Sequence, residues 1–270
     1  MLPGGRAALL RLGAALLVVA LFAWPRVAHA QIVNVQSLLG QDLPEGFSGN
    51  LDAGADWRTG NTELLLVQGA ATLRYKHENH LVFAVARGAY SRVGSGDDEE
   101  QILGNTFEHL RYRWKLHPRL TAEVFAQHEY DEFRRLELRA LGGIGPRITV
   151  LEQKTAGLVV GVAYMFEYQQ LDENPDLIDS GRTESTHRLS SYLLFTSALN
   201  DVVTFVDTVY YQPSLERTGD FRILDETQLQ VKLTEHFTFK TAFVLAHDSS
   251  PPESVKATDT ALQTGISFKF

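Results

Sequence analysis

The chain has 270 residues, with 33 acidic and 25 basic side chains, a formal net charge of −8, and no cysteine. This acidic balance argues against nucleic acid as a partner, because nucleic-acid binding requires a basic face. The lack of cysteine excludes disulfides, thiolate metal sites and a lipid anchor attached to cysteine.

Residues 1–30 have the pattern of a secretory signal peptide. Arg6 and Arg11 precede and interrupt an apolar run over 9–23, and Ala28-His29-Ala30 offers the small residues of a cleavage site after Ala30. The apolar run is shorter than the ~20 residues that a membrane-spanning helix needs. Cleavage would remove three arginines and no acid, so that 25 basic side chains fall to 22 against 33 acidic ones, a net charge of −11. We expect residues 31–45 to form a short periplasmic segment.

From residue 46 onward the chain divides into about twelve segments in which apolar and polar residues alternate. In chain order the segments run over 47–57, 65–75, 81–92, 109–116, 120–130, 135–147, 158–168, 189–199, 202–211, 221–233, 237–245 and 259–270. Alternation over about ten residues is typical of strands in outer-membrane barrels, whose faces contact lipid and lumen in turn. The pattern predicts an all-β fold: a transmembrane, antiparallel, up-and-down β-barrel of about 12 strands over residues 46–270.

The connections between these segments alternate in length. Those after odd-numbered segments are mostly long and acidic, as at 94–101 and 172–182, whereas those after even-numbered segments are short. Asn200-Asp201 is predicted to be a two-residue hairpin turn. Short turns at one end and long loops at the other are typical of outer-membrane barrels. We therefore expect the protein to be exported to a bacterial outer membrane, with its long loops outside.

The last segment, 259–270, alternates strictly and ends on Phe270, with Phe268 in the same phase. An ordinary edge strand of a soluble sandwich is the alternative interpretation of this segment alone. We interpret Phe268 and Phe270 as an assembly signal for the barrel-assembly machinery. Outer-membrane lipids are the other expected partner, and the oligomeric state is left open.

The polar face of the middle segments carries charges of alternating sign. Basic, acidic, basic and acidic rows on neighbouring strands would pair across the sheet. The predicted lumen residues are Arg111, Arg113, Lys115, Glu123, Glu129, Arg135, Glu137, Arg139, Arg147 and Glu167.

Two functions fit this predicted lumen. The rows could form a salt-bridge network that closes and rigidifies a structural or envelope-stress barrel. They could instead form a charged filter in a narrow channel for small polar or anionic solutes, as charged rings do in pores. A barrel of about twelve strands has room for either arrangement.

The stretches FEHLRYRWKL (residues 107–116) and LTAEVFAQHEYDEFRRLELRALGGIGPR (residues 120–147) resemble the core of the YdiY-like family, also called salt-induced outer-membrane proteins. The resemblance implies a Gram-negative outer-membrane barrel. It implies no activity and no catalytic residue, because the family has no established function.

An outer-membrane lipid-acting enzyme is a minor alternative. His128, His187 and His247 fall on or near the predicted outer face, and Ser249 and Ser250 follow His247. A serine next to a histidine is common by chance, and no lipase motif surrounds this one. We also expect no metal and no cofactor. His77 and His80 only flank a turn, and the acidic segment 94–101 lacks the spacing of a calcium loop.

Overall fold

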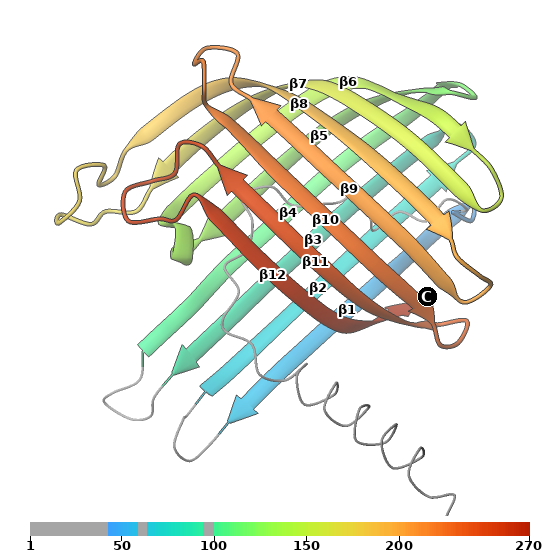
Figure 1. Cartoon of the computed structure of the whole chain (residues 1–270), viewed down its shortest axis with the longest axis horizontal. Helices are drawn as coiled ribbons and strands as arrows, with labels where there is room; N and C mark the ends of the chain where they lie inside the picture. Colours follow the sequence, from blue (N-terminus) through green and yellow to red (C-terminus); the bar gives the residue numbers. More distant parts are fainter. Residues whose placement is uncertain (1–42, 59–63, 94–99) are drawn as a thin grey trace, which may run out of the picture.

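The computed structural model describes residues 43–58, 64–93 and 100–270, and within them the chain forms a closed antiparallel barrel of twelve strands (Figure 1). The strands are β1 (Gly46–Arg58), β2 (Leu64–His77), β3 (His80–Val93), β4 (Glu100–His117), β5 (Leu120–Asp131), β6 (Leu136–Glu152), β7 (Ala156–Leu171), β8 (Thr183–Ala198), β9 (Val203–Pro213), β10 (Phe221–Lys232), β11 (Phe237–Asp248) and β12 (Thr258–Lys269). The predicted fold class and strand number are confirmed.

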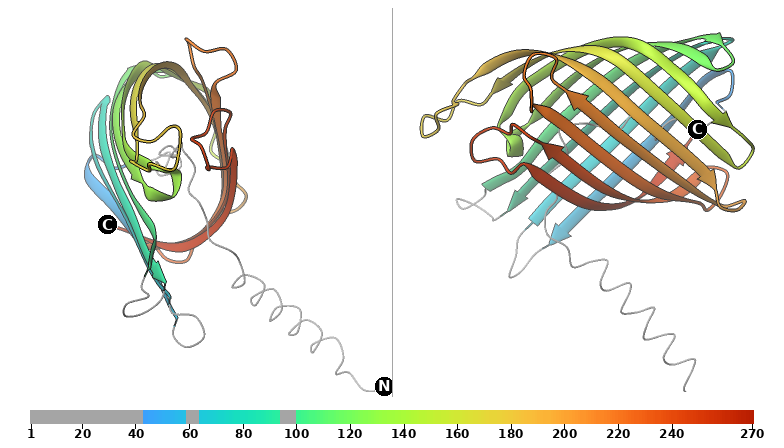
Figure 2. Two further views of the ribbon diagram at one scale, coloured as in Figure 1. Left: turned by 90° about the vertical axis from the view of Figure 1, so that its left-hand side faces the viewer. Right: turned by 45° about the horizontal axis from the view of Figure 1, so that its top comes forward.

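Each strand pairs with its neighbours in sequence, and β12 pairs with β1 to close the wall. Figure 2 shows the strands curling into a tube, with each strand oblique to the tube axis. Closure matters because every backbone N–H and C=O in the hydrocarbon region of a bilayer needs a partner. The described residues contain one short 3₁₀ turn, Glu132–Arg134, and no helix long and apolar enough to cross a membrane.

The seam between β1 and β12 is short. Three residue pairs form it, from Asn50 opposite Lys269 to Asp52 opposite Ser267. Phe270 extends the seam, because its backbone N and O exchange two 3.2 Å hydrogen bonds with Gly49. The chain therefore closes the barrel with its last four residues.

The outer face is apolar, as the alternation predicted. Outward side chains such as Leu110, Trp114 and Ile266 are 53, 47 and 53% exposed, whereas the inward side chains of Arg111, Arg113 and Ser267 beside them are buried. Aromatic rings gather near both ends of the wall: Phe47 packs on Tyr75 and Phe237 on Phe268 at one end, and Tyr211 packs on Phe221 at the other. This is the arrangement expected of a wall that faces lipid between two interfacial belts.

Two carboxylates interrupt the apolar outer face in the middle of β9 and β10. Asp207 and Asp225 both lie beside Thr227, whose hydroxyl is 3.0 Å from Asp207 Oδ1 and 3.4 Å from Asp225 Oδ1. Hydrogen bonding among these three side chains offsets part of the cost of placing them on an apolar face.

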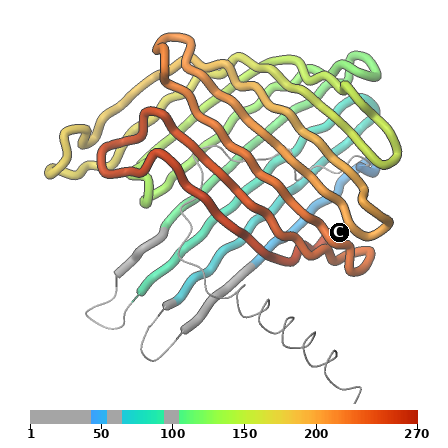
Figure 3. The backbone as a smooth tube through the Cα atoms, in the orientation of Figure 1, coloured from blue at the N-terminus to red at the C-terminus, as the bar shows by residue number. Residues whose placement is uncertain are grey.

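The connections confirm the predicted asymmetry. Those after even-numbered strands have two to four residues, whereas those after β7, β9 and β11 cover 172–182, 214–220 and 249–257 (Figure 3). The backbone N of Lys269 donates to His236 O, which places Phe270 at the end of the barrel with the short turns.

Two local predictions about the connections are wrong. The β8–β9 connection has four residues, 199–202, in place of a two-residue turn, because the side chain of Asn200 accepts hydrogen bonds from both Val202 N and Val203 N. The strand β4 begins at Glu100, inside the segment predicted as loop.

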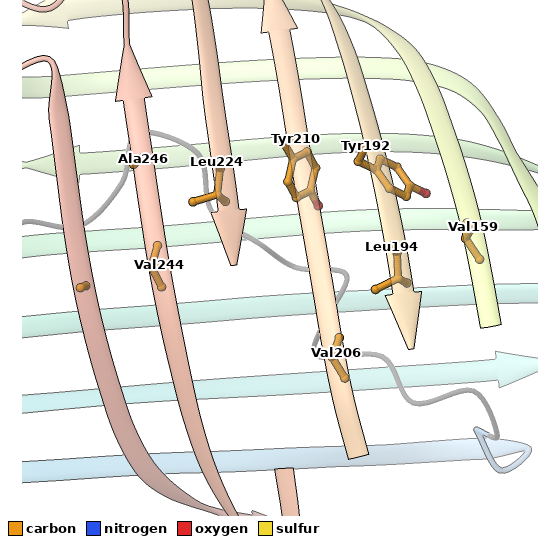
Figure 4. Packing of buried hydrophobic residues seen from close by; sticks show 9 residues of the cluster. Val159, Tyr192, Leu194, Val206, Tyr210, Leu224, Val244 and Ala246 are labelled. Atoms are coloured by element: carbon orange, nitrogen blue, oxygen red, sulfur yellow. The ribbon is translucent and has the colours of Figure 1, made fainter. Parts of the chain in front are cut away.

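Apolar clusters fill part of the lumen. The largest lies on the inner face of β7–β12 and includes Tyr192, Leu194, Tyr210, Leu224 and Val244 (Figure 4). Two smaller clusters lie on the inner face of β3–β7: one has Phe83, Val85 and Phe107, and the other has Phe125, Leu141 and Met165. The polar residues of the lumen are thus held between apolar walls.

Candidate functional site inside the barrel

Glu123 on β5 is the first of three buried carboxylates that each contact several arginines. It lies directly opposite Arg113 of β4, so the two side chains share the inner face. Arg113 Nε donates to Glu123 Oε1 at 2.6 Å, and Arg111 Nη1 donates to Oε2 at 3.2 Å. Tyr192 of β8 donates its hydroxyl to Oε2 at 2.8 Å, and Arg147 Nε lies 3.9 Å from Oε1. One carboxylate therefore faces three cations.

Glu167 on β7 is the second centre. Arg222 of β10 donates from Nη1 to both carboxylate oxygens, at 2.8 and 2.6 Å. Arg139 Nε and Arg188 Nε each lie 3.5 Å from the same carboxylate. Arg222 also donates from Nε to Asp248 Oδ2 at 3.1 Å, so it joins β7 to the outer end of β11.

Glu129 is the third centre. It accepts a short hydrogen bond from Arg134, which also donates from Nε to Asp131 Oδ2 at 2.9 Å. Arg139 Nη2 lies 3.3 Å from Glu129 Oε2, and its Nε faces Glu167. Arg139 therefore connects the second and third centres, and its side chain is 1% exposed.

We call the set of these residues the lumen network: Arg111, Arg113, Arg147, Glu123, Tyr192, Glu129, Asp131, Arg134, Arg139, Glu167, Arg188, Arg222 and Asp248. Its members come from strands β4–β8, β10 and β11, and from the 3₁₀ turn after β5. Several of its arginines bridge two carboxylates, so that each buried charge has an opposite charge beside it. Removing one partner of such a buried pair destabilises a protein by about 3–5 kcal/mol. The lumen network therefore ties distant parts of the wall together.

Aromatic rings flank the cations on the β3–β5 side. The guanidinium carbons of Arg87, Arg111 and Arg113 lie 4.8, 4.6 and 5.3 Å from the ring centroids of Phe107, Phe125 and Phe83. A cation over a desolvated ring gains up to about 2 kcal/mol. These stacking contacts add to the stabilisation of three arginines on the inner face.

A second group of charges joins three outer connections, and we call it the loop clasp: Arg135, Asp172, Asp179 and Glu253. Arg135 donates to Asp172 Oδ1 at 2.8 Å, to Asp179 Oδ1 at 2.6 Å and to the backbone O of Glu253 at 3.2 Å. Asp179 Oδ2 accepts from Glu253 N at 2.8 Å. Desolvation opposes ionisation of Asp179, but the hydrogen bonds from Glu253 and Arg135 outweigh it and hold the pKa of Asp179 below its ordinary value.

The buried charges of the lumen and its outer mouth are close to balance. Among the described residues, eight arginines and seven carboxylates are buried. Among the partly buried side chains of the lumen and mouth, Arg87, Arg147 and Lys240 add cations, and Asp52, Asp172, Asp179 and Asp259 add anions. A local surplus of positive charge exists around Glu123, where one carboxylate contacts Arg111, Arg113 and Arg147.

Comparison with known protein families gives the family membership of the chain. A family described as "Protein of unknown function, DUF481" matches residues 51–270, which is most of the chain. The chain belongs to the DUF481 family. This membership agrees with the resemblance to the YdiY-like family, and it assigns no activity to the lumen. Among curated proteins, no match to the chain is found.

Solved structures share the fold of this DUF481 protein. An outer-membrane channel from Pseudomonas putida F1 is 10% identical, with a TM-score of 0.54, and the match covers 89% of this chain and 100% of that one. The NanC porin is 11% identical, with a TM-score of 0.50, over 83% of this chain and 100% of that one. Together with the apolar outer wall, this fold makes the DUF481 protein an outer-membrane β-barrel.

The structure brings most of the predicted lumen residues together. Arg111, Arg113, Glu123, Glu129, Arg139, Arg147 and Glu167 all belong to the lumen network. Arg135 lies just before β6, with a left-handed backbone at φ 57°, and belongs to the loop clasp. Lys115 is exposed near the short-turn end of β4 and lies outside the network.

The placement of Glu137 in the lumen is wrong. The register of β6 against β7 shifts between Leu136 and Leu138, which reverses the alternation at the start of β6. Leu136 is therefore buried at 3% exposure, and Glu137 is exposed.

Sequence reasoning missed several members of the lumen network. Arg222 occupies the inward phase of the predicted tenth segment, and Arg188 lies one residue before the predicted eighth segment, in its inward phase, so that alternation could have identified both. Arg134 and Asp131 carried no such signal, because they lie at and beyond the end of β5, where strand alternation stops.

The histidines of the outer face do not form a catalytic arrangement with the nearby serines. His247 Nδ1 lies 2.8 Å from Thr258 Oγ1, whereas Ser249 Oγ donates to Gly219 O at 2.8 Å. His128 pairs with Glu108 at 2.6 Å. Across the described part of the chain, no group of three or more His, Asp or Glu side chains is arranged to hold a metal ion.

Proposed function

We propose that this protein is a narrow outer-membrane channel that prefers small anionic solutes. The observation that carries the proposal is the local surplus of cations in the lumen where Glu123 alone faces Arg111, Arg113 and Arg147. Surplus guanidinium groups in a low-dielectric lumen attract anions and repel cations.

In this conformation the lumen is narrow, because the network and the apolar clusters fill it. Passage therefore requires arginines to exchange a carboxylate partner for the solute. Such an exchange is cheaper where one carboxylate serves several cations, because the leaving arginine does not strand an unpaired anion. The Glu123 centre meets this condition.

The test is single-channel recording of refolded protein in a planar bilayer under a salt gradient. We expect small ohmic steps with a reversal potential that indicates anion preference. Arg111→Glu and Arg147→Glu should reduce or reverse that preference. Arg147 is the milder site, because it lies farthest from Glu123 and is partly exposed. Arg119→Glu, in the exposed β4–β5 turn, is the matched control for the charge change.

The second candidate function is a structural barrel with a closed lumen. The apolar clusters, of which Figure 4 shows the largest, and the bridging arginines favour it, because both rigidify the tube. Electrical silence from protein that is folded, as judged by heat-modifiable migration on gels, would contradict the channel and support this alternative.

We further propose that the protein has no enzymatic activity and that its partners are outer-membrane lipids and, during biogenesis, the barrel-assembly machinery. The outward apolar wall supports the lipid contact.

The proposed signal peptide, its cleavage after Ala30 and the periplasmic segment 31–45 fall on residues outside or at the edge of the described ranges. Mass spectrometry of the mature protein tests the cleavage.

A further inference from the structure

A small cavity lies inside the barrel, beside the lumen network. It is lined by His109, Arg111, Phe125, Gln127, Arg139, Leu141, Met165, Ser190, Tyr210 and Gln212. Two of these side chains are buried guanidinium groups, and none is a carboxylate. The lining therefore contributes positive charge to the cavity, and the carboxylates that pair with the two arginines, Glu123 with Arg111 and Glu129 with Arg139, do not line it.

Tyr210 contributes a buried hydroxyl without a hydrogen-bond partner in the protein. The residue is 3% exposed, and its ring is held against Tyr192 with centroids 5.5 Å apart. A buried hydroxyl that lacks a partner costs about 1–3 kcal/mol, so it requires an explanation. A ligand in the cavity that accepts hydrogen bonds would supply one.

The neighbouring polar groups are also arranged as donors. Arg111 donates from Nε to His109 Nε2 at 3.2 Å, so the imidazole proton of this neutral tautomer must be on Nδ1. Nδ1 lies 3.3 Å from Gln127 Oε1 and donates to it, which leaves the amide NH₂ of Gln127 as a donor. Ser190 Oγ accepts from Gln212 Nε2 at 3.0 Å, which leaves its hydroxyl proton to donate elsewhere.

We propose that this cavity binds one small inorganic anion, of the halide class, between Arg111, Arg139 and the hydroxyl of Tyr210. Guanidinium, hydroxyl and amide donors surround the cavity, and the ring of Phe125 and the side chains of Leu141 and Met165 desolvate it. Such a site is strong for a weakly hydrated anion and poor for a cation. The inference deepens the proposed channel function, because it gives the anion a position in the lumen. It rests on that function only for transport of the anion, since a closed barrel can bind the same ion.

The test uses chloride as the probe, on folded protein in detergent, by ³⁵Cl NMR line broadening. We expect saturable broadening with the unchanged protein. Tyr210→Phe removes one hydrogen bond to a charged group while the ring stays, and should weaken binding about tenfold. Tyr211→Phe is the matched control: it is the next residue, its ring faces outward beside Phe221, and chloride binding should not change.

A second measurement locates the ion. Crystals soaked in bromide should show an anomalous peak between Arg111, Arg139 and Tyr210. A peak elsewhere, no saturable broadening, or equal affinity in the Tyr210→Phe protein would overturn the site. Chloride binding without conductance would support the anion site and contradict the channel. Conductance without chloride binding would support the channel and contradict the anion site.

Discussion

Glu123 is one of two lumen carboxylates, with Glu167, that each contact three arginines. Its two oxygens accept from Arg111, Arg113 and Tyr192, and Arg147 lies nearby. The carboxylate is 3% exposed, so solvent cannot replace it. A change at this position affects strands on opposite sides of the tube, because Tyr192 belongs to β8 and Arg113 to β4.

Glu123→Gln should destabilise the barrel by about 3–5 kcal/mol, because it leaves buried guanidinium groups without their anion. Urea unfolding of the refolded protein in lipid vesicles measures the effect. The control is Glu108→Gln, which removes the exposed partner of His128 and should cost at most ~1 kcal/mol. Equal losses of stability from the two changes would show that Glu123 contributes no more to the stability of the barrel than an exposed ion pair.

At the scale of the element, the strands differ in how strictly they alternate. The strand β7 is regular, with Val159, Met165 and Glu167 buried and Val162 and Tyr164 exposed. The strand β6 begins with a register shift that moves Leu136 inward. The assembly role of Phe268 and Phe270 stays a prediction, although the structure places both at the seam.

Val160→Arg should destabilise the barrel by ~2–4 kcal/mol if the side chain faces the bilayer midplane. Val160 pairs with Ile148 and Leu193, whose side chains are 46 and 41% exposed on the outer wall. Leu199→Arg, in the β8–β9 turn, is the control, because arginine near the interface costs only ~0–1 kcal/mol. A neutral result at Val160 together with a stable fold would contradict the assignment of the outer face.

At the scale of the whole molecule, ion pairs tie together segments that are far apart in sequence. In the outer connections, Asp172 and Asp179 pair with Arg135, and Asp179 also accepts from the backbone of Glu253. The loop clasp joins connections that are far apart in sequence, from Arg135 to Glu253, across the outer mouth. The clasp therefore holds three outer connections to one another.

Acidification should open the loop clasp. The folded pKa of Asp179 is below its ordinary value, so its stabilising contribution is complete above the unfolded pKa of about 4 and is lost as pH falls through the folded pKa. Hydrogen exchange of the β7–β8 and β11–β12 connections, corrected for intrinsic rates, should rise below about pH 4. At neutral pH, Asp179→Asn should reproduce that rise, and Asp176→Asn in the same connection should not. Unchanged exchange in acid would show that the clasp does not hold these loops.

The sequence by itself determined the fold, the strand number and the two faces of the wall. These follow from a local periodicity of two, and a barrel in lipid enforces that periodicity on every strand, because one face contacts hydrocarbon and the other the lumen. It also identified most of the charged lumen residues, because Arg111, Arg113, Glu123 and Arg139 occupy the inward phase of regular strands.

Only the tertiary structure decided which charges meet. Arg222 and Glu167 are far apart in sequence, and their contact depends on how the tube curves and on which side chains reach across it. Glu137 left the lumen because a register shift at the start of β6 reversed the alternation, and no pattern of residues reveals such a shift. The cavity at Tyr210 likewise exists only between strands that closure of the barrel brings face to face.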